Sequence, residues 1–208
     1  MIGEGEIKRT YLQRSHVPLL AKFECDKPGC AEVVDFLRTG ALPEQDQNFS
    51  TTFVFVSGEP LAIDAYLTVS AASVRAPRRL RERLGTGRPF IPALMIDFVA
   101  VAKHRDGQDL GIRIFEWLQS EAQDLNATAG VRFIVLGVRA RNWGAYRIYV
   151  KKWGFEALPV PDPNDLSGRG FVPPPDPDQP KPAWMEDEDL IHLFYDLVEK
   201  NGTYVHVA

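Results

Sequence analysis

The stretch from Pro92 to Leu118 changes from one hydrophobic pattern to another within a few residues. Residues 93–101 are almost all apolar and end in β-branched side chains, which is typical of a strand buried on both faces of a sheet. Residues 109–119 carry apolar side chains at helical spacing, namely Leu110, Ile114, Trp117 and Leu118. A polar turn containing Gly107 separates the two patterns. We therefore predict a buried strand that turns sharply into an amphipathic helix.

The start of this predicted helix is suited to binding a phosphate group. The first backbone N–H groups of a helix have no partner inside it, and the peptide dipoles make that end partly positive. Gly107 and Gly111 would let a ligand approach the backbone closely. Many strand–turn–helix units bind no ligand, so this pattern leaves an anion site and an empty turn both open.

A second strand–helix pair follows. Residues 131–141 are typical of a strand and residues 142–152 of a short helix, which ends before Gly154 and Phe155. Together, the two stretches resemble the GNAT superfamily of N-acetyltransferases, which use acetyl-CoA. The residues that carry the resemblance are Val99, Ala100, Val101 and Asp106 to Gly111 for the pyrophosphate motif, and Asn142, Ala145, Tyr149, Gly154 and Phe155 for the second motif. Asp106 stands where the family usually has Gln or Arg, and Asp109 where it usually has Gly.

The resemblance implies an α/β fold of the GNAT (acyl-CoA N-acyltransferase) type. Its central mixed sheet is mostly antiparallel, contains one parallel pair of strands that splay apart, and is flanked by helices. We expect a single GNAT domain over residues 1–208, with a proline-rich loop inserted at about 158–186 before the last strand at residues 189–198. The positions implied to bind acetyl-CoA are Val99, Ala100, Val101, Asp106, Gly107, Gln108, Asp109, Gly111, Ile112, Asn142, Ala145 and Tyr149.

The implied reaction is transfer of an acetyl group to a primary amine by direct attack on the thioester. By resemblance, the Val99 amide would bind the thioester oxygen. Tyr149 lies two helical turns beyond Asn142 on the same face, and its phenol can protonate the leaving thiolate as a general acid. The alternative for Tyr149 is a core aromatic residue.

Asp97 is the candidate general base. It shares a strand face with Val99, and burial in an apolar run would raise its pKa. A purely structural carboxylate is the alternative, and an amine that arrives neutral needs no base. His104 and His192 are weaker candidates. Asp109 either caps the helix with its own side chain or turns outward and leaves the amides to the ligand.

The first half of the chain resembles one branch of the superfamily. Residues 6–13, 50–57 and 61–74 are typical of strands, the last two joined by a hairpin at residues 58–60, and a helical pattern precedes them within residues 22–42. The branch resemblance rests on Phe23 to Cys25, Phe36-Leu37, Ala41, Thr52, Ala71 to Val74 and Ile91-Pro92. That branch contains acetyltransferase toxins that modify aminoacyl-tRNA, which makes tRNA a candidate acceptor.

The segment from Arg75 to Arg88 carries six arginines in fourteen positions. It is either a solvated helix or loop, or a local site for an RNA backbone or the CoA phosphates. The formal net charge of the chain is −4, which argues against general attraction to nucleic acid or anionic membranes. The arginine segment, by contrast, keeps a local tRNA contact open.

Composition also indicates where the protein is expected to be located in the cell. No apolar run approaches the roughly 20 residues that span a bilayer, and the first residues lack the apolar core of a signal peptide. We expect a cytoplasmic protein with no membrane partner, in which Cys25 and Cys30 are reduced thiols. A redox pair is the alternative for the two cysteines. The sequence does not identify the acceptor amine. It also leaves open whether the protein is a homodimer, whether the proline-rich loop binds a partner domain, and whether the chain is a non-catalytic GNAT-like binding module.

Overall fold

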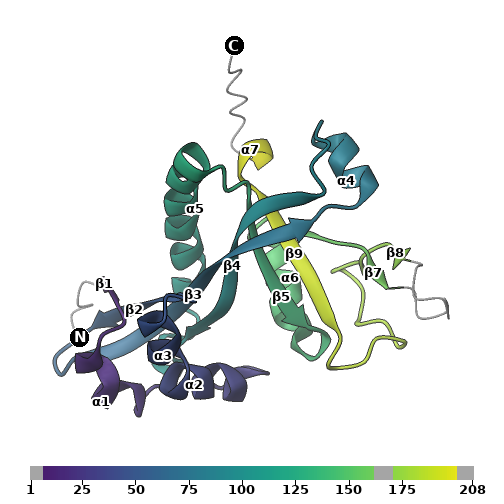
Figure 1. The fold of residues 1–208 in the computed structure, drawn as a ribbon. Coiled ribbons are helices and arrows are strands. Elements are labelled where there is room, and N and C mark those ends of the chain that lie inside the picture. Colours follow the sequence, from purple (N-terminus) through teal and green to yellow (C-terminus); the bar gives the residue numbers. More distant parts are fainter. Residues whose placement is uncertain (1–6, 162–170, 201–208) are drawn as a thin grey trace. The chain divides into compact units, whose positions relative to one another are not determined.

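The computed structural model describes residues 7–161 and 171–200 (Figure 1). The chain divides into two compact units, each built from two separate segments. Unit 1 consists of residues 1–71 and 95–118, and unit 2 of residues 72–94 and 119–208. None of the helices within the described ranges is both long and apolar enough to cross a membrane.

Unit 1 contains the elements of the first half of the chain and the predicted strand–turn–helix. In chain order they are β1 (Lys8–Tyr11), η1 (Arg14–His16), α1 (Val17–Leu20), α2 (Cys30–Thr39), α3 (Ala41–Asp46), β2 (Thr51–Ser57), most of β3 (Ala62–Arg75), the end of β4 (Phe90–Val101), η2 (Lys103–Arg105) and the first half of α5 (Leu110–Ala129). β2 and β3 form the predicted antiparallel hairpin, in which Val54 pairs with Tyr66.

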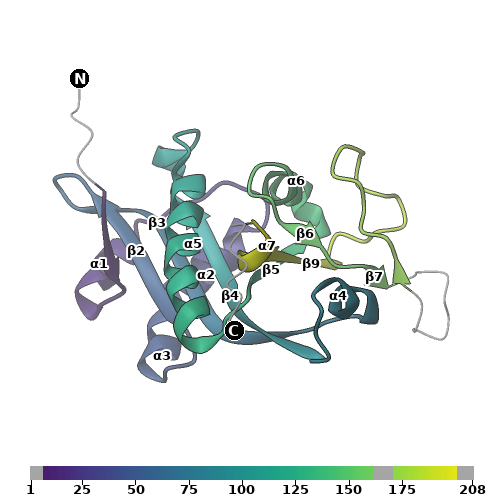
Figure 2. The ribbon, with the colours of Figure 1, turned by 90° about the horizontal axis from the view of Figure 1, so that it is seen from above.

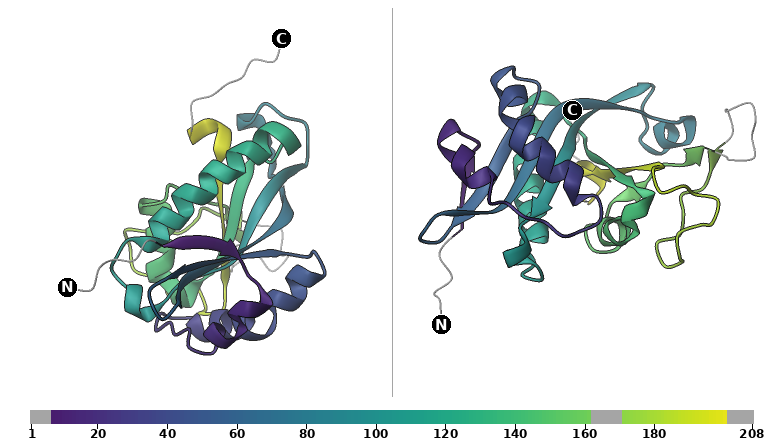
Figure 3. Two further views of the ribbon diagram at one scale, coloured as in Figure 1. Left: turned by 90° about the vertical axis from the view of Figure 1, so that its left-hand side faces the viewer. Right: turned by 90° about the horizontal axis from the view of Figure 1, so that it is seen from below.

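Alternating side chains of β2 pack against helices on both faces of the sheet in unit 1. Phe53 and Phe55 contact Trp117 of α5, with ring centroids 4.9 and 5.9 Å apart. Val54 and Val56 belong instead to a buried core with residues from α1, α2 and α3, namely Leu20, Leu37 and Ala41. α5 therefore covers one face of these strands and α1 to α3 cover the other (Figure 3).

Unit 2 contains the second predicted strand–helix pair. Its elements are α4 (Arg78–Arg83), the second half of α5, β5 (Phe133–Arg139), η3 (Ala140–Asn142), α6 (Trp143–Lys151), β6 (Glu156–Ala157), β7 (Val160–Pro161), β8 (Phe171–Val172), β9 (Leu190–Asp196) and α7 (Leu197–Lys200). β9 pairs antiparallel with both β5 and β6, and α6 lies beside these strands (Figure 2).

The main sheet has seven strands in the order β1-β2-β3-β4-β5-β9-β6. The β4–β5 pair is parallel and the other neighbours are antiparallel, which confirms the predicted mixed sheet flanked by helices. Predicted strands and helices are all present, with ends that differ by a few residues. The largest difference is α5, which continues ten residues past the predicted end at residue 119 to Ala129.

The proline-rich segment before β9 is irregular over its described residues and is attached to α6. The hydroxyl of Tyr146 donates to the carbonyl of Pro175 at 2.5 Å, and the indole N–H of Trp143 donates to the carbonyl of Gln179 at 3.1 Å. An ion pair joins Lys151 to Asp178. β7 and β8 form a separate two-stranded ribbon at the start of the segment.

The prediction of reduced thiols is wrong, because Cys25 and Cys30 form a disulfide with Cα atoms 5.7 Å apart. The physical reason lies in the turn between them. Gly29 adopts a left-handed backbone conformation with φ of 81° and caps α2, so the chain reverses and Cys30 becomes the first residue of that helix. The reversal brings the two cysteines to the separation that a disulfide requires.

Candidate functional site

The predicted site residues fall into two groups, one in each unit. Unit 1 contains Asp97 to Val101 and the turn with the start of α5, whereas unit 2 contains Asn142, Ala145 and Tyr149. Each group is described by itself.

The end of β4 presents two different faces. Phe98 stacks on Phe36 of α2 with ring centroids 3.9 Å apart, and Ala100 is buried in the same core. Asp97, Val99 and Val101 therefore lie on the opposite face of the strand, as predicted from the alternation. The backbone of Val99 and Val101 thus belongs to a strand that the core holds firmly from one side.

Asp97 is exposed and accepts a hydrogen bond from the hydroxyl of Ser70 at 3.0 Å. Desolvation of its carboxyl raises the pKa of Asp97, and the charge of Glu44 adds to this effect. The bond from Ser70 acts in the opposite direction without cancelling the shift. A carboxylate with a raised pKa is a better proton acceptor for an amine than an ordinary aspartate.

The turn between β4 and α5 contains two residues in the left-handed region. Gly107 has φ of 73° and Asp109 has φ of 53°. A non-glycine residue with positive φ is uncommon, although Asp tolerates this region better than most. Asp109 stands where the GNAT motif usually has Gly, and its backbone adopts the conformation that a glycine there would favour.

The helix that begins at Leu110 leaves the amides of Leu110, Gly111 and Ile112 without partners inside the helix. The amide of Gln108 donates instead to the carbonyl of Arg105 at 3.3 Å, and the amide of Gly107 donates to the carboxylate of Asp106 at 3.1 Å. The amides at the start of α5 are therefore available to an anion. The amides of Gly107 and Gln108 are already hydrogen-bonded within the turn. The Asp109 side chain is exposed.

A buried carboxylate that sequence analysis missed holds the turn in place. Asp64 of β3 is 1% exposed and accepts hydrogen bonds from Arg105 of η2, from Nε at 3.0 Å and from Nη2 at 3.2 Å. Nη2 also donates to the hydroxyl of Ser57 at 2.6 Å. Nε2 of His104 lies 2.8 Å from Asp64, so this weaker base candidate is engaged in the same cluster. Burial would raise the pKa of Asp64, but bonds from Arg105, Ser57 and His104 outweigh it and hold the pKa below its ordinary value.

In unit 2, Asn142 caps the start of α6. Its side-chain oxygen accepts a hydrogen bond from the amide of Ala145 at 3.3 Å. The two residues of the second motif thus bind each other, which fixes where the helix begins. The other weak base candidate, His192, is exposed on β9 and pairs in register with Gly137.

Tyr149 packs between two aromatic rings at the end of α6. Its ring centroid lies 4.8 Å from that of Trp153 and 6.1 Å from that of Phe155. Burial raises the pKa of Tyr149 to about 12, so the phenol keeps its proton throughout the physiological pH range. The hydroxyl of the neighbouring Tyr146 donates a hydrogen bond to the carbonyl of Pro175 and is thereby committed to a structural contact. Of these two tyrosines, Tyr149 is the better proton donor for a ligand.

The arginine-rich segment forms the short helix α4 and its flanks. Arg78 pairs with Glu82 at 2.7 Å, and Arg83 pairs with Glu156 at 2.8 Å. An open cavity of about 350 Å³ is lined by Arg78, Arg81, Glu82, Gly85 and Thr86. Acidic partners therefore neutralise part of the positive charge that the sequence suggested for this segment. Within the described ranges, no three or more His, Cys, Asp or Glu residues form a group that could hold a metal ion.

Comparison with known proteins gives a likeness in structure but not in sequence. No family model and no curated protein matches the chain. Among solved structures, it is similar to a Tyr-to-Phe mutant of KacT, with a TM-score of 0.67 and 15% identity over 95% of this chain and 98% of that one. It is also similar to AtaT complexed with acetyl-methionyl-tRNAfMet, with a TM-score of 0.66 and 14% identity over 95% and 100% of the two chains.

A third similar structure is AtaTR bound with AcCoA, with a TM-score of 0.62 and 16% identity over 95% of this chain and 99% of that one. Identities this low support the fold and nothing finer. Both chains are covered almost completely, and the strand order and the parallel β4–β5 pair agree with the predicted architecture. The chain therefore shares its fold with KacT and AtaT, and this fold is the predicted GNAT architecture.

Proposed function

We propose that this protein is an acetyl-CoA-dependent N-acetyltransferase that acts on a primary amine. The observation that carries the proposal is the turn at the start of α5, where Gly107 and Asp109 both adopt left-handed conformations. Strained non-glycine backbone is retained in proteins mainly where function needs it. Here the left-handed residues lead into the start of α5, whose first amides have no partner inside the helix. Such a helix start is suited to binding a pyrophosphate.

The residues present fit acetyl-CoA. The amides of Leu110, Gly111 and Ile112 would hold its pyrophosphate, and the backbone of Val99 and Val101 would pair with its extended arm. Bound acetyl-CoA would supply the acetyl group as a thioester. AtaTR, which has the same fold, was solved with AcCoA bound. Asp109 is exposed, which is consistent with a carboxylate that leaves the amides to the ligand.

Two side chains would handle the protons of the transfer. Tyr149 would act as general acid and donate its proton to the departing thiolate, because its phenol is protonated at neutral pH and the thiolate is a strong proton acceptor. Asp97 would accept a proton from the amine, because desolvation raises its pKa.

The test is release of free CoA thiol from acetyl-CoA in the presence of a panel of primary amines, with isothermal titration of acetyl-CoA as the binding measurement. We expect binding and amine-dependent thiol release. Absence of binding at millimolar acetyl-CoA would overturn the proposal. Binding without thiol release for any amine would instead favour a non-catalytic GNAT-like module.

For the acceptor, we propose the amine of an aminoacyl-tRNA as the first substrate to test. AtaT was solved with acetyl-methionyl-tRNAfMet, and this chain places arginines along α4 around an open cavity. Contacts to phosphates release counterions, so RNA binding through α4 would weaken steeply with salt. A gel shift with bulk tRNA between 50 and 200 mM salt, roughly the range over which such contacts are lost, should show this dependence in the wild type and less of it after Arg79→Ala. Equal salt dependence in both would exclude α4 as the RNA contact.

A further inference from the structure

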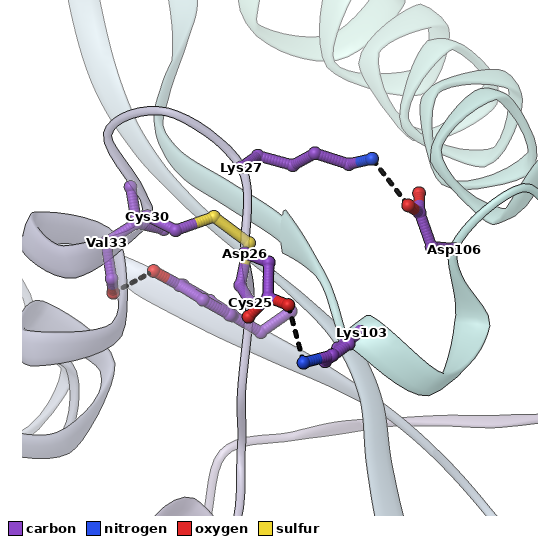
Figure 4. Close-up of a disulfide and its surroundings, with 8 residues drawn as sticks. Cys25, Asp26, Lys27, Cys30, Val33, Lys103 and Asp106 are labelled. Carbon is purple, nitrogen blue, oxygen red and sulfur yellow. Dashed lines mark hydrogen bonds and ion pairs between the residues drawn. A yellow bond between two sulfur atoms is a disulfide. The ribbon is translucent and has the colours of Figure 1, made fainter.

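We propose that the Cys25–Cys30 disulfide is a reducible clamp on the turn that precedes α5, and that its reduction weakens acetyl-CoA binding. The effect on acetyl-CoA affinity rests on the proposed function. The clamp itself involves only residues of unit 1 and does not depend on that function. Figure 4 shows the disulfide, the turn and the ion pairs that join them.

Two ion pairs of opposite polarity connect the disulfide loop to the turn. The ammonium of Lys103 lies 2.6 Å from the carboxylate of Asp26, and the ammonium of Lys27 lies 2.5 Å from the carboxylate of Asp106. A backbone hydrogen bond adds a third link, because the amide of Lys103 donates to the carbonyl of Glu24 at 2.8 Å. All three links start within or directly beside the loop that the disulfide closes.

The disulfide is what keeps these links together. The side chains in both ion pairs are about 60% exposed, and exposed pairs contribute little by themselves because water screens them. Cys30, by contrast, is 8% exposed and begins α2, so the covalent bond fastens the loop to a buried helix start. Once the bond is broken, Glu24 to Lys27 lose that attachment, and both ion pairs must be maintained by a chain with greater freedom.

The position of Lys27 matters to an anion on the turn. Asp106 immediately precedes Gly107, and its carboxylate would repel the pyrophosphate proposed to lie on the helix start. Lys27 places a positive charge against that carboxylate, 79 residues away in sequence. The loop thereby supplies a cation at the position where the GNAT motif usually has Gln or Arg. Release of the loop would leave Asp106 without this cation and make the turn more negative.

Reduction is a balanced exchange with a dithiol reductant. A thiolate of the reductant attacks the sulfur of Cys25, which is half-buried and next to exposed residues. The bond between the two cysteine sulfurs breaks, and Cys30 leaves as a thiolate at the start of α2, where the helix dipole favours negative charge. The second thiol of the reductant then attacks the mixed disulfide and releases Cys25. Two electrons and two protons pass to the protein, and the reductant becomes a disulfide.

The clamp is tested first without any ligand, by amide hydrogen exchange of the full chain before and after reduction with dithiothreitol. Two adjacent amides give a matched comparison. Lys103 donates to Glu24 in the disulfide loop, whereas Ala102 donates to the carbonyl of Asp64 in β3 at 2.7 Å. We expect reduction to increase exchange at Lys103 at least tenfold and to leave Ala102 unchanged. Unchanged exchange at both amides would overturn the clamp, and so would equal increases at both, because that result would indicate general unfolding.

The effect on binding is tested by titrating acetyl-CoA into the oxidised and reduced protein, and into a variant with Cys25→Ser and Cys30→Ser that needs no reductant. We expect about two- to fivefold weaker binding without the disulfide, the size of an exposed charge interaction. Lys27→Ala should produce the same loss and remove the dependence on reduction. Lys22→Ala, which removes an exposed lysine just before the loop, should leave both unchanged.

The outcomes separate this inference from the proposed function. Equal affinity in the oxidised and reduced protein would overturn the redox effect and leave the acetyltransferase proposal intact. No binding to either form would overturn the proposed function and, with it, the effect on affinity, while hydrogen exchange would still decide whether the clamp exists.

Discussion

Arg105 at the end of η2 reaches the buried carboxylate of Asp64 in β3 with two nitrogens, at 3.0 and 3.2 Å. The pair spans 41 residues of sequence and joins the turn before α5 to the start of β3, next to the hairpin turn. The turn is therefore supported by a buried ion pair from the hairpin and by exposed ion pairs from the disulfide loop. The buried pair stabilises the turn, whereas the exposed pairs allow the turn to respond to reduction of the disulfide.

Replacing Asp64 by Asn should destabilise the protein strongly, because Arg105 would lose the buried carboxylate that balances its charge. We expect a loss of about 3 kcal/mol in the free energy of unfolding, measured by urea denaturation. Asp46→Asn is the control, since Asp46 pairs with Arg14 on the exposed surface at 3.2 Å and such pairs contribute less than about 1 kcal/mol. Similar losses in the two variants would show that the Asp64 cluster has no special role.

The same carboxylate should make stability depend on acid pH. The folded state holds the pKa of Asp64 below its ordinary value of 3.8, so the unfolded state takes up a proton first as the pH falls. The stabilisation by Asp64 is therefore fully present above pH 3.8 and is lost as the pH drops towards the lower pKa of the folded state. Thermal unfolding between pH 5 and 2.5, the approximate range in which paired carboxylates titrate, should show a shallower decline for Asp64→Asn than for the wild type.

Tyr149→Phe should lower turnover and leave acetyl-CoA binding intact, because the variant keeps the aromatic ring and loses only the proton. Removal of a general acid typically costs about 10²- to 10⁴-fold in rate, so kcat should fall by at least about a hundredfold with an unchanged Kd for acetyl-CoA. Tyr146→Phe is the matched control on the same helix. It removes the bond to Pro175 and should cost about 1–2 kcal/mol of stability with turnover retained. Full turnover by Tyr149→Phe would rule out its role as the acid.

Asp109 allows charge and backbone conformation to be tested separately. Asp109→Gly and Asp109→Ala remove the same carboxylate, but only glycine adopts a φ of 53° without steric cost. Relative to Asp109→Ala, Asp109→Gly should be more stable by about 1 kcal/mol in chemical denaturation. Both variants should bind acetyl-CoA more tightly than the wild type if the carboxylate repels the pyrophosphate. Weaker binding by the glycine variant would mean that Asp109 itself contributes to the site.

Local sequence patterns predicted the parts of the fold that depend on interactions between residues close in sequence. The alternation in residues 50–57 and 61–74 identified the hairpin, because half-buried strands must alternate. Residues 142–152 were predicted as a short helix, and Asn142 caps it because its side chain accepts the bond of an amide three residues later. The expected rise in the pKa of Asp97 is also found, although the residue is exposed and only its carboxyl is partly desolvated.

The disulfide and the contacts between distant segments were not predictable in the same way. The disulfide was missed because it depends on the left-handed turn at Gly29, which spacing alone does not reveal. Asp64 did carry a signal, since a carboxylate inside an apolar strand must find a partner. Its partner, Arg105, could not be identified, because many arginines were available and only the folded register selects one.

Unit 1 is assembled from two segments separated by residues 72–94, and its buried core joins Leu12 to Ala100 and Ala102. During synthesis, the ribosome must therefore release about half of the chain, through Ala102, before this core can close. A fragment that stops at residue 94 lacks the end of β4 and all of α5. The emerging N-terminal half would then expose apolar surface for several seconds at ordinary translation rates, which makes this protein a natural client for chaperones that bind nascent chains.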